Sequence, residues 1–138
     1  MREIKFRGKT VEGAKLWKYG SFLAPSNAAC KPLIYEHLSV PTRDGNGYWY
    51  EVDELTVGQF TGLFDCEGKE IYEGDVVRHE NCICLVVYNS TRFASFALRK
   101  DGWAFDHYFG EAFEASECQV IGNIHDTPGL LEAKNARD

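Results

Sequence analysis

The chain has 138 residues, of which 44% are hydrophobic and 26% are charged, and its formal net charge is −6. This length is enough for one domain, or for two small lobes that share a core. The acidic balance argues against general binding to polyanions, because phosphate contacts need clustered Lys and Arg. No apolar run approaches the about 20 residues of a membrane span, and the N-terminus lacks the apolar stretch of a signal peptide. We therefore expect a cytoplasmic protein that does not enter membranes.

The first part of the chain, residues 1–56, is predicted to be a small β-rich unit. Alternation of apolar with polar residues, and runs of aromatic residues, are typical of half-buried strands. Four stretches of this kind are expected strands: 2–7, 16–22, 33–40 and 48–52. Residues 41–47 hold Asp-Gly and Asn-Gly in succession, which predicts a loop at a hairpin tip. Asp53-Glu54-Leu55 predicts one helical turn.

Residues 57–127 are predicted to form a second compact unit, also built from short strands. The expected strands are 60–64, 69–72, 76–79, 82–88, 93–98 and 118–124. A short helix is expected around 110–116. Several short strands separated by tight turns predict a small closed barrel of the SH3-like type. The fold class is therefore mainly β, with the N-terminal part packed on this barrel and 128–138 as a C-terminal tail.

Two tight turns organise the segment 56–78. Asp65-Cys66-Glu67-Gly68 predicts a turn in which the aspartate bonds its own backbone and the glycine takes a positive φ. Glu73-Gly74-Asp75 predicts a second sharp turn. The residues assigned to such structural turns are Gly62, Asp65, Gly68, Gly74 and Asp75.

The strand expected at 82–88 is apolar on both faces. Cys82, Cys84, Val86 and Tyr88 alternate with Ile83, Leu85 and Val87. A strand that is apolar on both sides is covered on both sides. Either the N-terminal part or a second subunit is expected to provide the second cover.

None of the candidate reactive groups matches a catalytic or metal-binding pattern. His79, Cys82 and Cys84 come closest to a zinc site, but Cys-x-Cys within a strand is not the spacing that zinc requires, so buried thiols are favoured. The five carboxylates between Asp65 and Asp75 allow a cation site or an acid/base pair, whereas turn chemistry explains the same residues. We therefore predict no metal, no cofactor and no catalytic residue, and hence a protein that is not an enzyme.

The segment GQFTGLFDCEGKEIYEGDVVR, residues 58–78, resembles the signature of the YopX family of bacteriophage and prophage proteins. REIKFRGK and WKYGSF near the N-terminus, and CQVIGNIHDTPGLL near the C-terminus, also resemble that family. The resemblance implies an SH3-like barrel preceded by a smaller β-rich part, and a phage or prophage origin. It implies no catalytic residues. The chain departs from the family pattern at Phe64 and Cys66, where polar turn residues are more usual, and in its Cys82–Cys84 strand.

Two classes of function remain open. The first is a non-enzymatic interaction protein that self-associates and engages a host or phage protein through exposed aromatic residues. The candidate surface consists of Trp49, Trp103, Phe105, Tyr108 and Phe109. The alternative is a nucleic-acid-associated small barrel. Only the shared strand face of Lys5, Arg7 and Lys9 supports this alternative, and the acidic balance counts against it.

Overall fold

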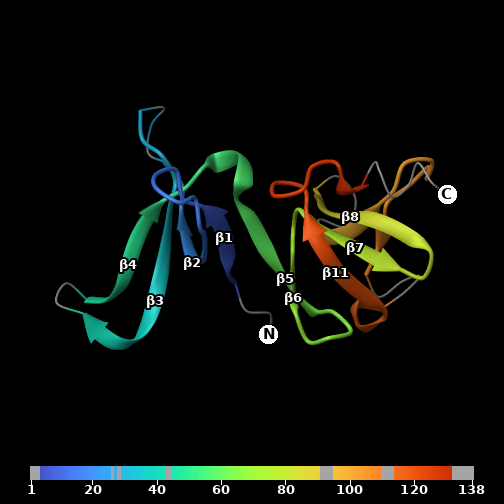
Figure 1. The fold of residues 1–138 in the computed structure, drawn as a ribbon, viewed down its shortest axis with the longest axis horizontal. Helices are drawn as coiled ribbons and strands as arrows, with labels where there is room; N and C mark the ends of the chain where they lie inside the picture. Colours follow the sequence, from blue (N-terminus) through green and yellow to red (C-terminus); the bar gives the residue numbers. More distant parts are fainter. Residues whose placement is uncertain are drawn as a thin grey trace. The chain divides into compact units, whose positions relative to one another are not determined.

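The computed structural model describes residues 4–25, 27, 29–42, 45–90, 95–109 and 114–131, with only the backbone described for 38–42 and 45–46. The chain divides into two compact units, residues 1–60 and 61–138, and each is described by itself. Antiparallel strands build both units, as Figure 1 shows, and the mainly β fold predicted from the sequence is confirmed. Within the described residues, no helix has the length and apolar character needed to cross a membrane.

The first unit is a curled antiparallel sheet. Its strands are β1 (Phe6–Lys9), β2 (Trp17–Leu23), β3 (Leu33–Thr42), β4 (Gly45–Glu51) and the start of β5 (Gly58–Phe64), in the order β4-β3-β2-β1-β5. A single 3₁₀ turn, η1 (Glu54–Thr56), precedes β5 where one helical turn was predicted. Thr10 forms an antiparallel bridge with Val52, and the Asp53 N–H donates to the Lys9 carbonyl at 2.8 Å. These contacts join the end of β4 to the end of β1, so the sheet curls around its inner face.

The inner face of this sheet holds the core of the first unit. Ile34 and Val52 are fully buried. Phe22 lies directly opposite Ile34 across β2 and β3, so both side chains point to the same face. Gly8 completes the packing, because a Cβ atom at this position would lie only 3.0 Å from the Val52 side chain. A glycine is needed here for close approach, and not for a turn.

β3 and β4 form the hairpin expected around residues 41–47, but the predicted loop is too long, because β3 continues to Thr42 and β4 begins at Gly45. Residues 43–44 lie outside the described residues. Thr42 pairs with Gly45, and Gly47 pairs with His37 inside the ladder. A Cβ atom on Gly47 would lie 2.1 Å from the Glu36 carbonyl oxygen. Asn46-Gly47 therefore has the composition of a turn, while the glycine actually serves a close contact between neighbouring strands.

The second unit contains a five-stranded antiparallel sheet in the order β10-β9-β8-β7-β11, while β6 pairs beside β5. The strands are β6 (Glu70–Tyr72), β7 (Asp75–His79), β8 (Cys82–Asn89), β9 (Ser95–Arg99), β10 (His107–Tyr108) and β11 (Cys118–Asn123). The helix expected around 110–116 is described only at its end, where η2 (Ala115–Glu117) is a 3₁₀ turn; residues 110–113 lie outside the described residues. The SH3-like closure of 57–127 stays a prediction.

One face of the five-stranded sheet forms the core of the second unit. Val77 lies opposite Cys84, and Val86 lies opposite Leu98, so these four side chains share a face. The buried cluster consists of Ile71, Val77, Cys84, Val86, Leu98, Ala115, Cys118 and Val120. On the other face of β8, Ile83 is buried whereas Leu85 and Val87 are half-buried. The two apolar faces of this strand are therefore covered unequally within the described residues.

Gly74 gives a direct test of the turn that enters β7. Its φ is +94°, its N–H donates to the Val86 carbonyl at 2.9 Å, and its carbonyl accepts from the Ile124 N–H at 3.0 Å. Gly74→Val places a β-branched side chain where such residues are strained, so we expect a loss of about 1–3 kcal/mol of unfolding free energy. Urea denaturation measures this loss. Gly129→Val is the control, because a Cβ atom there meets open space; equal stability of the two variants would contradict the assignment.

Candidate functional site

The β5–β6 turn is fixed by the Asp65 carboxylate, which is only 5% exposed. Its Oδ1 atom accepts the backbone N–H groups of Glu67 at 2.8 Å and Lys69 at 2.9 Å. Its Oδ2 atom accepts the Val120 N–H at 2.9 Å, which ties the turn to β11. Burial raises the pKa of Asp65, but the hydrogen bonds from these three N–H groups outweigh burial and hold the pKa below its ordinary range. The Asp65 carboxylate therefore stabilises the turn and its contact with β11.

The neighbouring carboxylates also serve local structure. Asp75 is buried, and its Oδ2 atom accepts the Tyr72 N–H at 2.8 Å. Glu67 accepts from the side-chain amide of Gln119 at 3.0 Å, and Glu70 accepts from the Tyr72 hydroxyl at 3.0 Å. Among the described residues, no three His, Cys, Asp or Glu side chains are placed to hold a metal ion. Gly68 lies in the β5–β6 turn with a φ of +80°. The assignment of Gly62 to a turn is wrong, because this glycine lies inside β5, where its φ is +84°.

The cysteines divide into buried and exposed thiols. Cys84 and Cys118 are fully buried, and burial raises the pKa of the Cys84 thiol to about 11 and that of Cys118 to about 12. Both thiols therefore stay protonated and act as small apolar core residues. Cys82 accepts a weak hydrogen bond from the Lys100 ammonium at 3.7 Å. Cys30 and Cys66 are exposed and are the thiols accessible to reagents.

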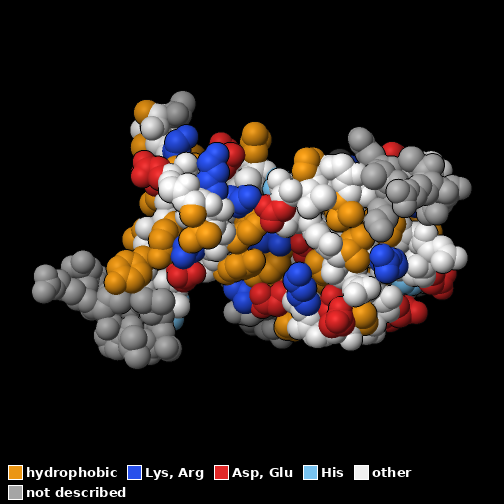
Figure 2. Space-filling view, in the orientation of Figure 1, with side chains coloured by type: hydrophobic (Ala, Val, Ile, Leu, Met, Phe, Trp, Pro, Cys, Tyr) orange, Lys and Arg blue, Asp and Glu red, His pale blue; other side chains and the backbone are white. Residues whose placement is uncertain are grey.

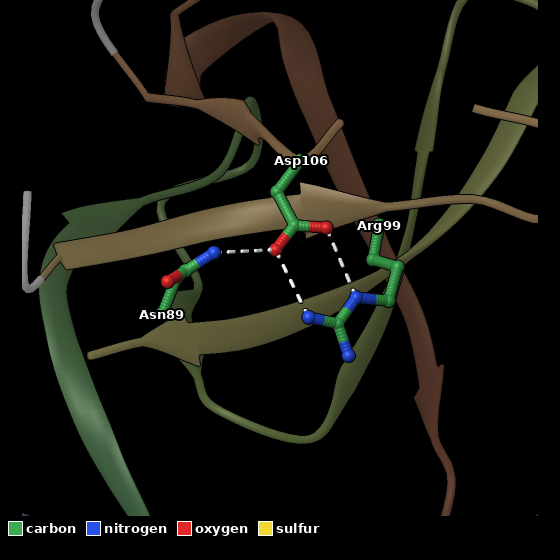
Figure 3. Close-up of polar contacts among 3 residues, drawn as sticks. All are labelled: Asn89, Arg99 and Asp106. Carbon is green, nitrogen blue, oxygen red and sulfur yellow. Dashed lines mark hydrogen bonds and ion pairs between the residues drawn. The ribbon is translucent and has the colours of Figure 1, made fainter. Parts of the chain in front are cut away.

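A three-residue clamp holds the segment between β9 and β10 (Figure 3). Arg99 donates from Nε to Asp106 Oδ1 at 2.9 Å and from Nη2 to Oδ2 at 3.0 Å, while Asn89 donates to the same Oδ2 at 3.0 Å. The hydrogen bond from Arg99 lowers the pKa of Asp106 and raises that of Arg99 itself. The clamp borders an open hollow of about 500 Å³ that Trp103 and Phe105 also line. Both oxygens of the Asp106 carboxylate therefore accept hydrogen bonds within the clamp.

The predicted aromatic surface is only partly a surface. Tyr108 is 4% exposed, so its assignment to an interaction surface is wrong: β10 pairs with β9 and places Tyr108 opposite Ala97 on the sheet. Trp103 and Phe109 pack against the core, and Trp103 stacks on His107 with ring centroids 3.9 Å apart. Phe105 and Trp49 are exposed, at 69% and 53%. Trp49 belongs to the first unit, and the other four residues belong to the second.

Sequence reasoning missed an aromatic face on the first unit, which lies on the outer side of the curled sheet. Arg7 lies opposite Tyr19, Lys9 opposite Trp17, and Tyr35 opposite both Ser21 and Trp49. These residues therefore share one face, which we call the outer face: Arg7, Lys9, Trp17, Tyr19, Ser21, Tyr35, His37 and Trp49. The rings of Tyr35 and Trp49 lie 4.8 Å apart. Figure 2 shows basic and hydrophobic side chains next to one another on the viewed side of this unit.

A separate hollow of about 450 Å³ lies at the end of the first unit where the sheet curls. Trp49 lines it together with Leu16 and Tyr50, and Glu12, Lys18 and Glu51 contribute charges of both signs. Leu16 is 55% exposed. The hollow thus combines exposed apolar side chains with mixed charge, a composition that suits contact with protein.

A family model described as YopX protein matches residues 5–132 of the chain. The chain belongs to the YopX family. The matched span includes residues of both units, so the YopX match is not confined to one of them. A search of curated proteins gives no match to this sequence. In this YopX chain, the segment 58–78 builds β5, β6 and β7 with the two turns between them, which makes it a structural signature.

Replacing Asp65 tests its role as the tie between the turn and β11. In Asp65→Asn the amide nitrogen cannot accept the Val120 N–H, so we expect a loss of about 1–3 kcal/mol at pH 7. Because the folded-state pKa of Asp65 is lowered, its charge stabilises the wild type above about pH 4, and this contribution is lost as the pH falls through the folded pKa. The gap between the two proteins should therefore narrow at pH 3. Urea denaturation at both pH values measures it.

The control for this experiment is Asp101→Asn, which removes a charge from an exposed residue. Its unfolding free energy should stay within about 0.5 kcal/mol of the wild type. If Asp65→Asn behaves like this control, or if its difference from wild type does not change between pH 7 and pH 3, the assigned role of Asp65 is wrong.

Metal independence is tested separately. The buried thiols Cys84 and Cys118 pack in the apolar core. We therefore predict that no metal contributes to the free energy of folding and that EDTA leaves the melting temperature unchanged. A drop of several degrees, accompanied by stoichiometric zinc in the purified protein, would show that the thiols bind metal.

Proposed function

We propose that this YopX protein is a non-enzymatic interaction module that self-associates through the hollow around Trp49. The observation that carries the proposal is the exposure of Trp49. A tryptophan that is 53% exposed beside a leucine that is 55% exposed leaves a large apolar surface in water. Covering such side chains is favourable, and Trp is among the residues that contribute most to the free energy of protein–protein binding.

A second copy of the chain is the occupant that the charges of the hollow favour. Glu12 and Glu51 carry negative charge there, and Lys18 carries positive charge. In a two-fold symmetric dimer each patch meets its own copy, so a patch with both signs can pair acid with base across the axis. Lys18 also lies 3.8 Å from Glu36 and 4.4 Å from the centre of the Tyr50 ring, which holds its ammonium at this site.

The hydrogen bonds and the burial of the reactive side chains support the proposal that the protein is not an enzyme. The Asp65 and Asp106 carboxylates bond backbone or side-chain donors, and the Cys84 and Cys118 thiols are buried and protonated. In the part of the chain that the structure describes, no three His, Cys, Asp or Glu side chains are placed to hold a metal ion. We further propose that the protein acts in the cytoplasm of a bacterial host, as a phage or prophage product, where it also engages a host or phage protein.

Trp49→Ala tests the proposed contact. We expect the wild type to give an oligomeric mass by light scattering at micromolar concentration, and the variant to shift toward monomer by a factor of at least about 10 in dissociation constant. Tyr48→Ala is the matched control, because Tyr48 is 50% exposed on the same strand but does not line the hollow. A strictly monomeric wild type would refute self-association. Equal changes in dissociation constant for the two variants would show that the dimer contact does not lie at the Trp49 hollow.

A further inference from the structure

We propose that the outer face of the first unit binds single-stranded nucleic acid, with bases stacked on its aromatic rings and phosphates held by its lysines. The proposal does not depend on self-association at the Trp49 hollow. It follows from the side-by-side placement of aromatic rings and cations on one sheet face, which the strand register creates. Single strands offer unpaired bases for stacking, whereas the bases of a duplex are stacked on one another.

The binding surface includes a hollow of about 500 Å³. Tyr19 and Tyr35 line it from neighbouring strands together with Lys5, and Ser21 contributes only a small side chain. Tyr19 is 41% exposed, so one of the rings is open to a ligand. His37 is exposed and lies 6.2 Å from Tyr35, ring centre to ring centre. A small residue between larger rings leaves space that a flat base can enter.

Cations lie along the strand next to these rings. The Arg7 guanidinium lies 4.7 Å from the centre of the Trp17 ring, and the Lys9 ammonium lies 5.8 Å from the same centre. Lys5 lies 5.3 Å from the centre of the Phe60 ring. A contact with the face of an aromatic ring positions a cation but leaves its charge intact. Arg7 is buried and supports Trp17, so Lys5 and Lys9 are the cations placed to meet phosphate.

The acidity of the whole chain hides an uneven distribution of charge. Residues 1–60 contain eight Lys and Arg against seven Asp and Glu, whereas residues 61–138 contain seven against fourteen. The formal charge is therefore +1 for residues 1–60 and −7 for residues 61–138, which together give −6. Glu36, the acidic residue among those lining the hollow, lies 3.8 Å from Lys18. The first unit thus offers its lysines without a surrounding excess of carboxylates.

The width of the outer face limits the number of bases that it can bind. Neighbouring strands lie about 4.8 Å apart, so the three strands β1 to β3 span roughly 10 Å. This span accommodates about two or three stacked bases, as in other sheet-based binders of single strands. Few cations face the strand, so binding should be weak, stacking-dependent and only modestly sensitive to salt.

Fluorescence anisotropy with labelled oligothymidylate and oligouridylate of about twelve nucleotides tests the proposal at low salt. We expect the full chain to bind single strands at least about tenfold more tightly than a duplex of the same length. Tyr19→Ala should weaken binding at least about fivefold, whereas Tyr19→Phe, which keeps the ring, should bind like wild type. Lys9→Ala should reduce the slope of log K against log salt by about 0.7, the value for one phosphate contact on a single strand.

The controls are Tyr48→Ala and Lys31→Ala, which remove an exposed aromatic ring and an exposed cation from outside the outer face. Both should bind like wild type, and unfolding curves of all variants establish that they fold. A preference for either DNA or RNA supports the proposal and identifies the sugar. The proposal is overturned if neither oligonucleotide binds at micromolar concentration, if duplex binds equally well, or if Tyr19→Ala and the controls are indistinguishable.

Discussion

The second unit of this protein depends on one buried carboxylate. Asp65 accepts two N–H groups of its own turn and a third from Val120, a residue 55 positions away in the chain. Removing a carboxylate from water costs several kcal/mol, and charge-assisted hydrogen bonds to backbone donors offset that cost. The arrangement fixes β11 against the β5–β6 turn, where the Cys66 N–H also donates to the Cys118 carbonyl at 2.8 Å. The position of Cys118 in the core follows from this tie.

Two further carboxylates of the second unit also accept hydrogen bonds that hold its strands and turns. Asp75 closes the turn that enters β7, and Asp106 holds Arg99 and Asn89 in place. Each of these carboxylates already accepts hydrogen bonds, and the bonds to Asp106 lower its pKa. The segment 58–78, which resembles the YopX signature, contains Asp65 and Asp75 together with the turns that they hold.

The first unit differs in composition and in what it exposes. Its inner face is closed by Ile34 and Val52, and its outer face leaves Tyr19 and Trp49 in contact with water. Most of the acidic residues belong to the second unit. The exposed aromatic side chains of the first unit are therefore the basis of both proposed contacts.

Alternation and turn composition determined much of the fold from the sequence alone. Strand positions and the turns at Asp65 and Gly74 depend on a few consecutive residues, because φ, ψ and side-chain direction are set locally. Exposure was decided only by the tertiary structure. Tyr108 is covered because β10 pairs with β9, and Gly47 is a packing glycine because Glu36 approaches it from the next strand. The outer face and the Asp65–Val120 bond likewise require strand register, which brings distant residues together and leaves no trace in the local pattern.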